Sequence, residues 1–315
     1  MSDLTSLWLP IAFIAPILWA LVSVLDLYFL HGAYQDEWDG TLISGIFQIL
    51  PWLLVPVGLV HYTPLPLEAM VLALLGGSMF LASFFFYFRA LFRFADAALV
   101  QILWNVAVLV VPFFAWIILD ERLQLIQYLG IALAFFGLTR LASREGMLGQ
   151  GFRRIAWSMV WAVLLMSASM VLQKDAYRIA SGLFLDVYLT FSLGVAITAA
   201  MLAVANIQST VTRIQRVAAL DSRYFVLFVF AEFISILGTL SSQRAIDLSP
   251  SPSFVAAVES VSPIVLMLLS IIVASAFARQ GIHSSSAMYH DQVLGWRKKV
   301  LAVVFISSGI YCIAD

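Results

Sequence analysis

Residues 67–90 read LEAMVLALLGGSMFLASFFFYFRA, and this stretch decides the fold class. Its only charged residues are Glu68 and Arg89, so the twenty residues between them carry no formal charge. At about 1.5 Å per helical residue, twenty residues cover roughly 30 Å, which is the thickness of the hydrocarbon core of a bilayer. The stretch therefore predicts a helix that crosses a membrane.

Apolar runs of similar length recur along the whole chain of 315 residues. The first run has no basic residue before it and is followed by Asp36 and Glu37, which favours a retained helix over a cleaved signal peptide. The predicted fold class is thus an all-α integral membrane protein of about ten transmembrane helices. We expect these helices at 7–30, 41–60, 67–90, 95–119, 124–142, 154–175, 183–205, 223–245, 252–277 and 299–314.

The composition agrees with lipid as the main solvent of the chain. Hydrophobic residues make up 63% and charged residues 11% of the sequence, against roughly 45–50% and about 25% in soluble domains. The 17 Lys and Arg nearly balance the 18 Asp and Glu. The chain therefore lacks the excess of positive charge that would predict a nucleic-acid partner. Cys312 is the only cysteine and reads as a small core residue. Without a nucleotide-binding loop, a nucleophile motif or a metal-ligand cluster, we expect no enzyme activity, no cofactor and no bound metal.

The midpoint of the chain predicts a duplication, with one five-helix repeat over 1–146 and a second over 147–315. Residues 89–112 align with residues 244–267, and the alignment pairs Arg89 with Arg244. An odd number of helices per repeat would insert the second repeat upside down, which is the inverted-repeat plan of many secondary transporters.

Four features of the first half carry a resemblance to a known family. They are YFRAL at 87–91, Pro112 in the fourth run, LDERL at 119–123, and the glycines at 130 and 137. This pattern resembles the EamA-type transporters of the drug/metabolite transporter superfamily. Asp120 stands where that family usually has glycine, and the second half keeps Pro263 but lacks the Glu-Arg turn. The resemblance implies two EamA-like repeats and export of a small metabolite, and it does not indicate which one.

Charge counting and the family resemblance disagree on orientation. Connectors on the side that carries both termini hold 4 of the 17 basic residues, and connectors on the opposite side hold 13. The positive-inside rule then places both termini away from the cytoplasm, whereas the family usually has both termini inside. Both orientations stay open at this point.

Ionisable groups at membrane depth mark candidate sites, because each costs at least about 2.5 kcal/mol to insert unless it faces the bundle interior. Glu232 and Ser235 begin a polar stripe that continues along one face of the predicted helix 223–245. Glu259 lies four residues before Pro263 in the next run, so the proline frees a backbone carbonyl beside the carboxylate. Each glutamate is a candidate for the substrate path, with a structural carboxyl that joins two helices as the alternative.

In the first half, Gln101 and Asn105 lie one turn apart on the predicted helix 95–119, with Trp104 beside them. The repeat alignment pairs Trp104 and Asn105 with Glu259 and Ser260, so both halves carry polar groups at one level. Trp19 and Asp26 share a face of the first helix. We include these five first-half residues among the candidates for a substrate site, although amide pairs also join membrane helices without binding anything.

These patterns predict a secondary transporter that moves a small metabolite, with export as the expected direction. Substrate-binding candidates are Glu232, Glu259, Asn105, Gln101, Trp104, Asp26, Trp19 and Ser235. Burial favours the protonated form of a carboxyl group, which makes Glu232 or Glu259 a candidate proton carrier. A flippase for a lipid-linked or amphipathic substrate, a membrane enzyme and a non-transporting scaffold are the alternatives. Expected partners are the bilayer, the substrate and protons, for a monomer or homodimer in the cytoplasmic membrane if the source is bacterial.

Overall fold

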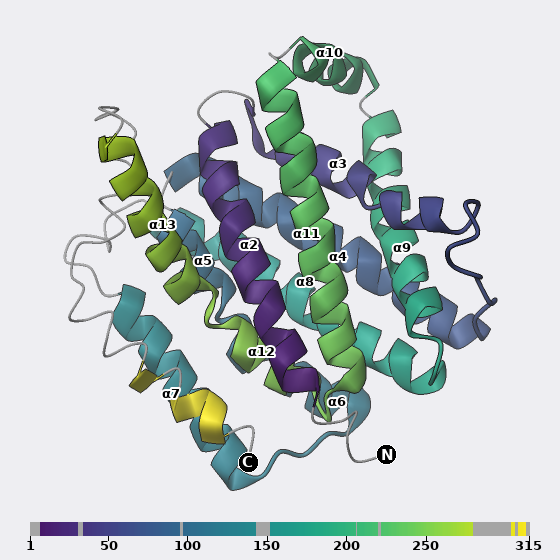
Figure 1. The fold of residues 1–315 in the computed structure, drawn as a ribbon. Coiled ribbons are helices and arrows are strands. Elements are labelled where there is room, and N and C mark those ends of the chain that lie inside the picture. Colours follow the sequence, from purple (N-terminus) through teal and green to yellow (C-terminus); the bar gives the residue numbers. More distant parts are fainter. Residues whose placement is uncertain are drawn as a thin grey trace.

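The computed structural model describes residues 7–30, 34–94, 97–142, 152–205, 207–219, 222–279, 304–305 and 308–312, and its regular elements within these ranges are all helical (Figure 1). The helices in chain order are α2 (Trp8–Leu30), α3 (Glu37–Phe47), the 3₁₀ helix η1 (Leu50–Leu54), α4 (Leu67–Phe94), α5 (Ala97–Trp104), α6 (Ala107–Leu119), α7 (Leu125–Ala142), α8 (Phe152–Ile179), α9 (Phe184–Ala205), α10 (Ile207–Ala218), α11 (Ser222–Leu248), α12 (Pro252–Glu259) and α13 (Ser262–Arg279).

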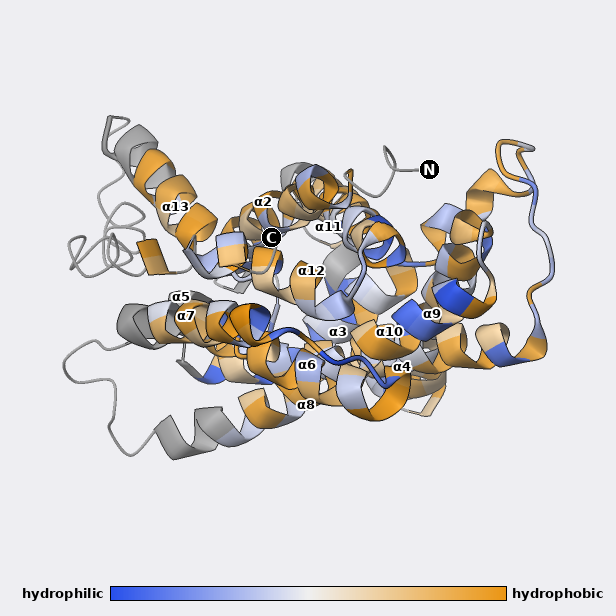
Figure 2. Ribbon diagram, turned by 90° about the horizontal axis from the view of Figure 1, so that it is seen from below, coloured by the Kyte–Doolittle hydropathy of each residue, from blue (hydrophilic) through white to orange (hydrophobic). Residues whose placement is uncertain are grey.

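Six segments among the described residues are long and apolar enough to cross a membrane. They are Trp8–Asp26, Leu67–Arg93, Trp157–Ile179, Phe184–Ala205, Phe225–Leu248 and Pro252–Ile272, with shorter apolar helices at Ala107–Leu119 and Leu125–Gly137. Figure 2 shows that apolar residues cover most of the helical surface, while the strap from α6 to α7 is polar. The chain is therefore an all-α membrane protein with several spans, as the composition predicts.

The prediction of one continuous helix over 41–60 is wrong. Helix α3 ends at Phe47, a 3₁₀ turn follows, and turns occupy residues 55–58. Pro51 and Pro56 lack the backbone N–H that an α-helix needs, and Gly58 adopts a φ of 78°, a left-handed conformation that ends helices. The sequence is apolar enough to span, but its backbone is not suited to one helix.

Two other predicted helices are each broken into two. The run 95–119 forms α5 and α6, and the run 252–277 forms α12 and α13. At the first break Val106 N donates to Leu103 O over 3.2 Å, and at the second Val261 N donates to Val258 O over 3.1 Å. Both bonds are of the tighter i to i−3 kind, which turns the chain without leaving the donor unsatisfied.

The two breaks fall at equivalent places along the chain. Helices α5 and α12 end at Trp104 and Glu259, which are 155 residues apart, and α4 and α11 begin at residues 67 and 222, again 155 apart. This is the offset that aligns Arg89 with Arg244. The main packing partners also correspond, since α4 packs along α8 and α11 packs along α2, while α6 contacts α8 and α13 contacts α2.

Close packing holds α4 against α9. A Cβ on Gly77 would lie 2.2 Å from Phe191 O, and one on Gly194 would lie 2.5 Å from Leu74 O, so only glycine fits at either place. Small residues of this kind let membrane helices approach at backbone distance. The contact fixes α4, which carries much of the site described below.

The connector expected at 206–222 contains a further helix, α10, which lies across the end of α11 (Figure 1). Its exposed Ile207 and Val211 and its inward Arg213 and Arg216 make it amphipathic. The predicted repeat boundary at 146–147, most of the connector 278–298 and most of the last predicted span lie outside the described residues.

Candidate functional site

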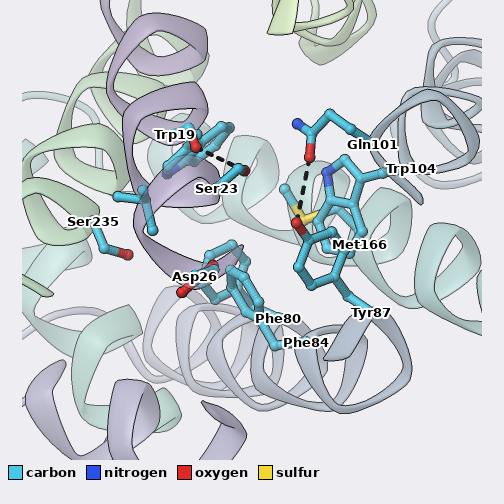
Figure 3. A pocket seen from close by; sticks show the side chains of 11 residues that line it. Trp19, Ser23, Asp26, Phe80, Phe84, Tyr87, Gln101, Trp104, Met166 and Ser235 are labelled. Carbon is cyan, nitrogen blue, oxygen red and sulfur yellow. Dashed lines mark hydrogen bonds between the residues drawn. The ribbon is translucent and has the colours of Figure 1, made fainter. Parts of the chain in front are cut away.

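A pocket opens inside the helical bundle between α2 and α4 (Figure 3). Its empty space, including the part open to solvent, is about 460 Å³. Five helices line it, namely α2, α4, α5, α8 and α11. The lining residues are Trp19, Val22, Ser23, Asp26, Phe80, Phe84, Tyr87, Gln101, Trp104, Met166 and Ser235.

Helix α2 supplies the polar side of the pocket. Trp19, Ser23 and Asp26 follow one another at helical spacings of four and three, so they share one face. The Ser23 hydroxyl donates to the backbone oxygen of Trp19 over 2.9 Å, which uses its proton within the helix. Asp26 is 8% exposed and is one of the lining residues. The strongest polar group that faces the pocket from α2 is thus a buried acid.

The opposite wall is aromatic. Phe80, Phe84 and Tyr87 lie on one face of α4, and Trp104 from the end of α5 joins them. The Trp104 ring centroid lies 5.2 Å from that of Tyr87 and 5.8 Å from that of Phe84. Phe80 and Phe84 pack edge to face at 4.7 Å. These separations are those of favourable aromatic pairs, so the rings support each other and form a preformed wall.

The break between α5 and α6 is held by amide groups. Asn105 Nδ2 donates to the backbone oxygen of Gln101 over 2.7 Å. The Gln101 side chain lines the pocket, where Tyr87 Oη lies 3.5 Å from its Oε1, the outer limit of a hydrogen bond (Figure 3). Gln101 is therefore a pocket residue, while Asn105 lies behind it and stabilises the turn.

Glu232 lies beside the pocket rather than in its lining. The Ser44 hydroxyl of α3 donates to Glu232 Oε1 over 2.6 Å, and Glu232 Oε2 is buried with no hydrogen-bond partner among the described residues. Glu232 is close enough to Asp26 for the two carboxylates to repel each other. Ser235, one helical turn further along α11, does line the pocket.

Glu259 lies apart from the pocket, at the end of α12. Ser242 of α11 donates to Glu259 Oε1 over 2.6 Å, and both residues are buried. The predicted stripe on α11 therefore faces inward along its length, with Glu232 near one end and Ser242 near the other. At the second end the stripe joins two helices of the same half.

Of the eight predicted site residues, the structure brings five to one pocket: Trp19, Asp26, Gln101, Trp104 and Ser235. Sequence reasoning missed Phe80, Phe84, Tyr87, Val22 and Met166. The α4 aromatics do repeat at helical spacing, but a run of five consecutive aromatic residues at 84–88 hides which of them face inward.

A cluster of charged residues outside the pocket joins α10 to the start of α3. Arg213 bonds Asp36 and Asp39, each over 2.5 Å, and Arg216 bonds Asp39 over 2.5 Å. Partial burial raises the pKa of the Asp36 carboxyl, but the hydrogen bond and the charge of Arg213 outweigh it and hold this pKa below its ordinary value. The same contact with Asp36 raises the pKa of the Arg213 guanidinium. These four residues form the ionic cluster of the molecule's α10 end.

The described residues contain no group of three or more His, Cys, Asp or Glu side chains that could hold a metal ion.

Comparisons with known proteins describe the fold alone. No protein-family model and no curated protein matches the chain. A solved structure described as "Crystal structure of protein" is similar over 96% of this chain and 98% of its own, with a TM-score of 0.59 and 18% sequence identity. At that identity the likeness supports the arrangement of helices and says nothing about activity.

Proposed function

We propose that the protein is a secondary transporter of the EamA type, which moves a small metabolite across the membrane by alternating access. One observation carries the proposal: two helices are broken at places 155 residues apart in sequence, and the inner pocket, which α5 of the first broken helix lines, has walls from both halves of the chain. Discontinuous helices at the interface of repeats are the usual surroundings of a substrate site in such transporters.

The proposal includes a duplicated chain in which two five-helix repeats are inverted, with about ten spans in all. Three backbone bonds support the duplication because each recurs at the same offset. Asn105 N to Gln101 O and Ser260 N to Ala256 O are both 3.2 Å, and the pairs that follow at the two breaks also correspond. The exchange of partners between α2 and α11 and between α8 and α4 is what a two-fold relation between repeats would produce.

Energy would come from an ion gradient, and the buried carboxyl groups are the candidates for proton coupling. Glu232 has one oxygen without a partner among the described residues and interacts with Asp26 of the pocket, which makes it the better placed of the two glutamates. Glu259 is bonded to Ser242 away from the lining. We therefore assign the proton carrier to Glu232 and a structural role to Glu259.

Solute counterflow in proteoliposomes tests transport directly. A metabolite panel is first screened for ligands that raise the melting temperature of the detergent-purified protein, since a ligand of the folded state stabilises it by mass action. The stabilising ligand is then loaded and its exchange is followed with a label. We expect exchange by the wild type, acceleration by an imposed pH gradient, and loss of that acceleration in Glu232→Gln but not in Glu259→Gln. Gradient-dependent transport at an unaltered rate in Glu232→Gln would refute the proton assignment.

A flippase is the second candidate, and one feature favours it. A groove between α6 and α7 is lined by apolar residues, of which Phe113, Trp116 and Tyr128 are about half exposed at the outer surface of the bundle. A lipid tail would suit such a groove. Translocation of a fluorescent lipid by the same proteoliposomes, without counterflow of any water-soluble ligand, would favour the flippase.

A further inference from the structure

The pocket pairs an acid with an aromatic wall. Asp26 comes from α2, and Phe80, Phe84, Tyr87 and Trp104 come from α4 and α5, with Tyr87 and Trp104 across the view from Asp26 (Figure 3). Aromatic faces carry partial negative charge and attract cations within about 6 Å of the ring centroid. Both walls of the pocket therefore favour positive charge.

No basic residue among the described lining residues neutralises the acid of the pocket. None of the described lining residues is a lysine, arginine or histidine. Glu232 adds a second buried carboxyl within electrostatic reach of Asp26, and the two are 4% and 8% exposed. Buried carboxylates without a cationic partner cost several kcal/mol each, so the site is stabilised when a proton or a positively charged ligand is present.

An inorganic ion fits this pocket less well than an organic one. Ions such as Ca²⁺ and Mg²⁺ are held by six or more oxygen ligands, and the lining supplies few oxygens beside its rings. A cation with an apolar or aromatic body would fill the space between the rings and place its charge near Asp26. Met166 adds a polarizable side chain that adapts to such a body.

We propose that this pocket binds a small organic cation, namely an ammonium compound with an aromatic or alkyl body, with Asp26 as its counter-ion and the rings of Tyr87 and Trp104 beside its charge. The inference names the substrate class for the proposed transporter and rests on that function only for the statement that the cation is moved. Binding itself stands or falls separately.

Calorimetric titration of the purified full-length protein with benzyltrimethylammonium tests the binding. N,N-dimethylbenzamide and phenylmethanesulfonate serve as neutral and anionic probes of similar size. We expect the cation to bind at least about tenfold more tightly than either. Asp26→Asn should weaken cation binding by at least about 30-fold, because it removes one member of a buried charge pair. Trp104→Leu should weaken it by about fivefold through the loss of one cation–π face.

Matched variants separate a local effect from misfolding. Asp186→Asn makes the same change at a buried aspartate outside the pocket and should leave cation affinity unchanged. Ser235→Lys places an ammonium group in the lining and should abolish cation binding if the protein elutes as the wild type does. Equal binding of the neutral probe, or wild-type affinity in both Asp26→Asn and Ser235→Lys, would overturn the proposal.

Transport distinguishes the two proposals. If the cation binds in the pocket but shows no counterflow, the transporter proposal fails and the cation site stands. If a neutral or anionic metabolite is exchanged while no cation binds, the cation site is wrong and the transporter proposal stands.

Discussion

Two pairs of acids in the molecule differ in what surrounds them. Asp36 and Asp39, at the start of α3, are bonded to two arginines of α10. Asp26 and Glu232 are also buried, and no arginine or lysine of the described residues is bonded to either.

The first pair is an element of structure, and the second has the features of a binding site. Ionic partners within the chain satisfy an acid permanently and leave it nothing to bind. An acid that the fold buries without a cation destabilises the protein unless something else supplies a proton or a positive charge. Altering the first pair should therefore lower the stability of the protein. Altering the second pair should raise its stability and weaken its function.

Removal of Asp39 should produce the largest change. Its side chain is fully buried and bonds both arginines, so Asp39→Ala leaves two guanidinium groups without their shared partner. We expect the free energy of unfolding to fall by about 3 kcal/mol, the lower end of the range for a broken buried pair, because the arginines can still reach water. Chemical unfolding in detergent measures it, with Asp186→Asn as the control, and a loss under about 1 kcal/mol would contradict the structural role.

Neutralising Glu232 should have the opposite sign. Glu232→Gln keeps a side-chain oxygen that can accept from Ser44 but removes the repulsion with Asp26. We expect the free energy of unfolding at pH 7.5 to rise by about 1 kcal/mol, because replacing a buried charge with a neutral group of similar volume is often stabilising. The same assay on Asp39→Asn should show a fall. Destabilisation by both changes would mean that the two pairs do not differ in the way described.

The sequence indicates single buried acids of this region better than it indicates the continuity of the helices around them. Hydropathy alone predicts spans, and Asp26 and Glu232 stand out because charge is rare in apolar runs. It does not predict that 41–60 breaks up, because apolar content and helical continuity are separate properties and Pro51 and Pro56 affect only the second.

Partners across the fold are the part that sequence reasoning could not supply. The contact of Arg213 with Asp36 joins residues 177 positions apart, and nothing local in either segment indicates the other. The α4 aromatics were likewise hidden, since only the packing of α4 on α8 and α9 decides which of its rings turn toward α2.

A substitution at Ser44 tests the pair Asp26 and Glu232 through a smaller expected effect. Its hydroxyl is the one described donor to Glu232. Ser44→Ala should lower the free energy of unfolding by about 1 kcal/mol, the usual net value of such a bond. The loss should be smaller in the Glu232→Gln background, where the acceptor is neutral, and a double-mutant cycle measures the difference. Strictly additive losses would show that the bond does not stabilise the charged carboxylate.

Acid titration should give the smallest effect, at the pair Asp36 and Asp39. The folded-state pKa of Asp36 is lowered from its ordinary value of 3.8, so its contact with Arg213 stabilises the protein fully above that value. This contribution is lost as the pH falls through the lower folded-state pKa. The Asp36 side chain is 37% exposed, and solvent screening therefore keeps the effect modest. Between pH 3 and pH 6, the free energy of unfolding should fall more steeply with acid in the wild type than in Asp36→Asn. Parallel curves would show that the Asp36 carboxylate adds nothing to the cluster.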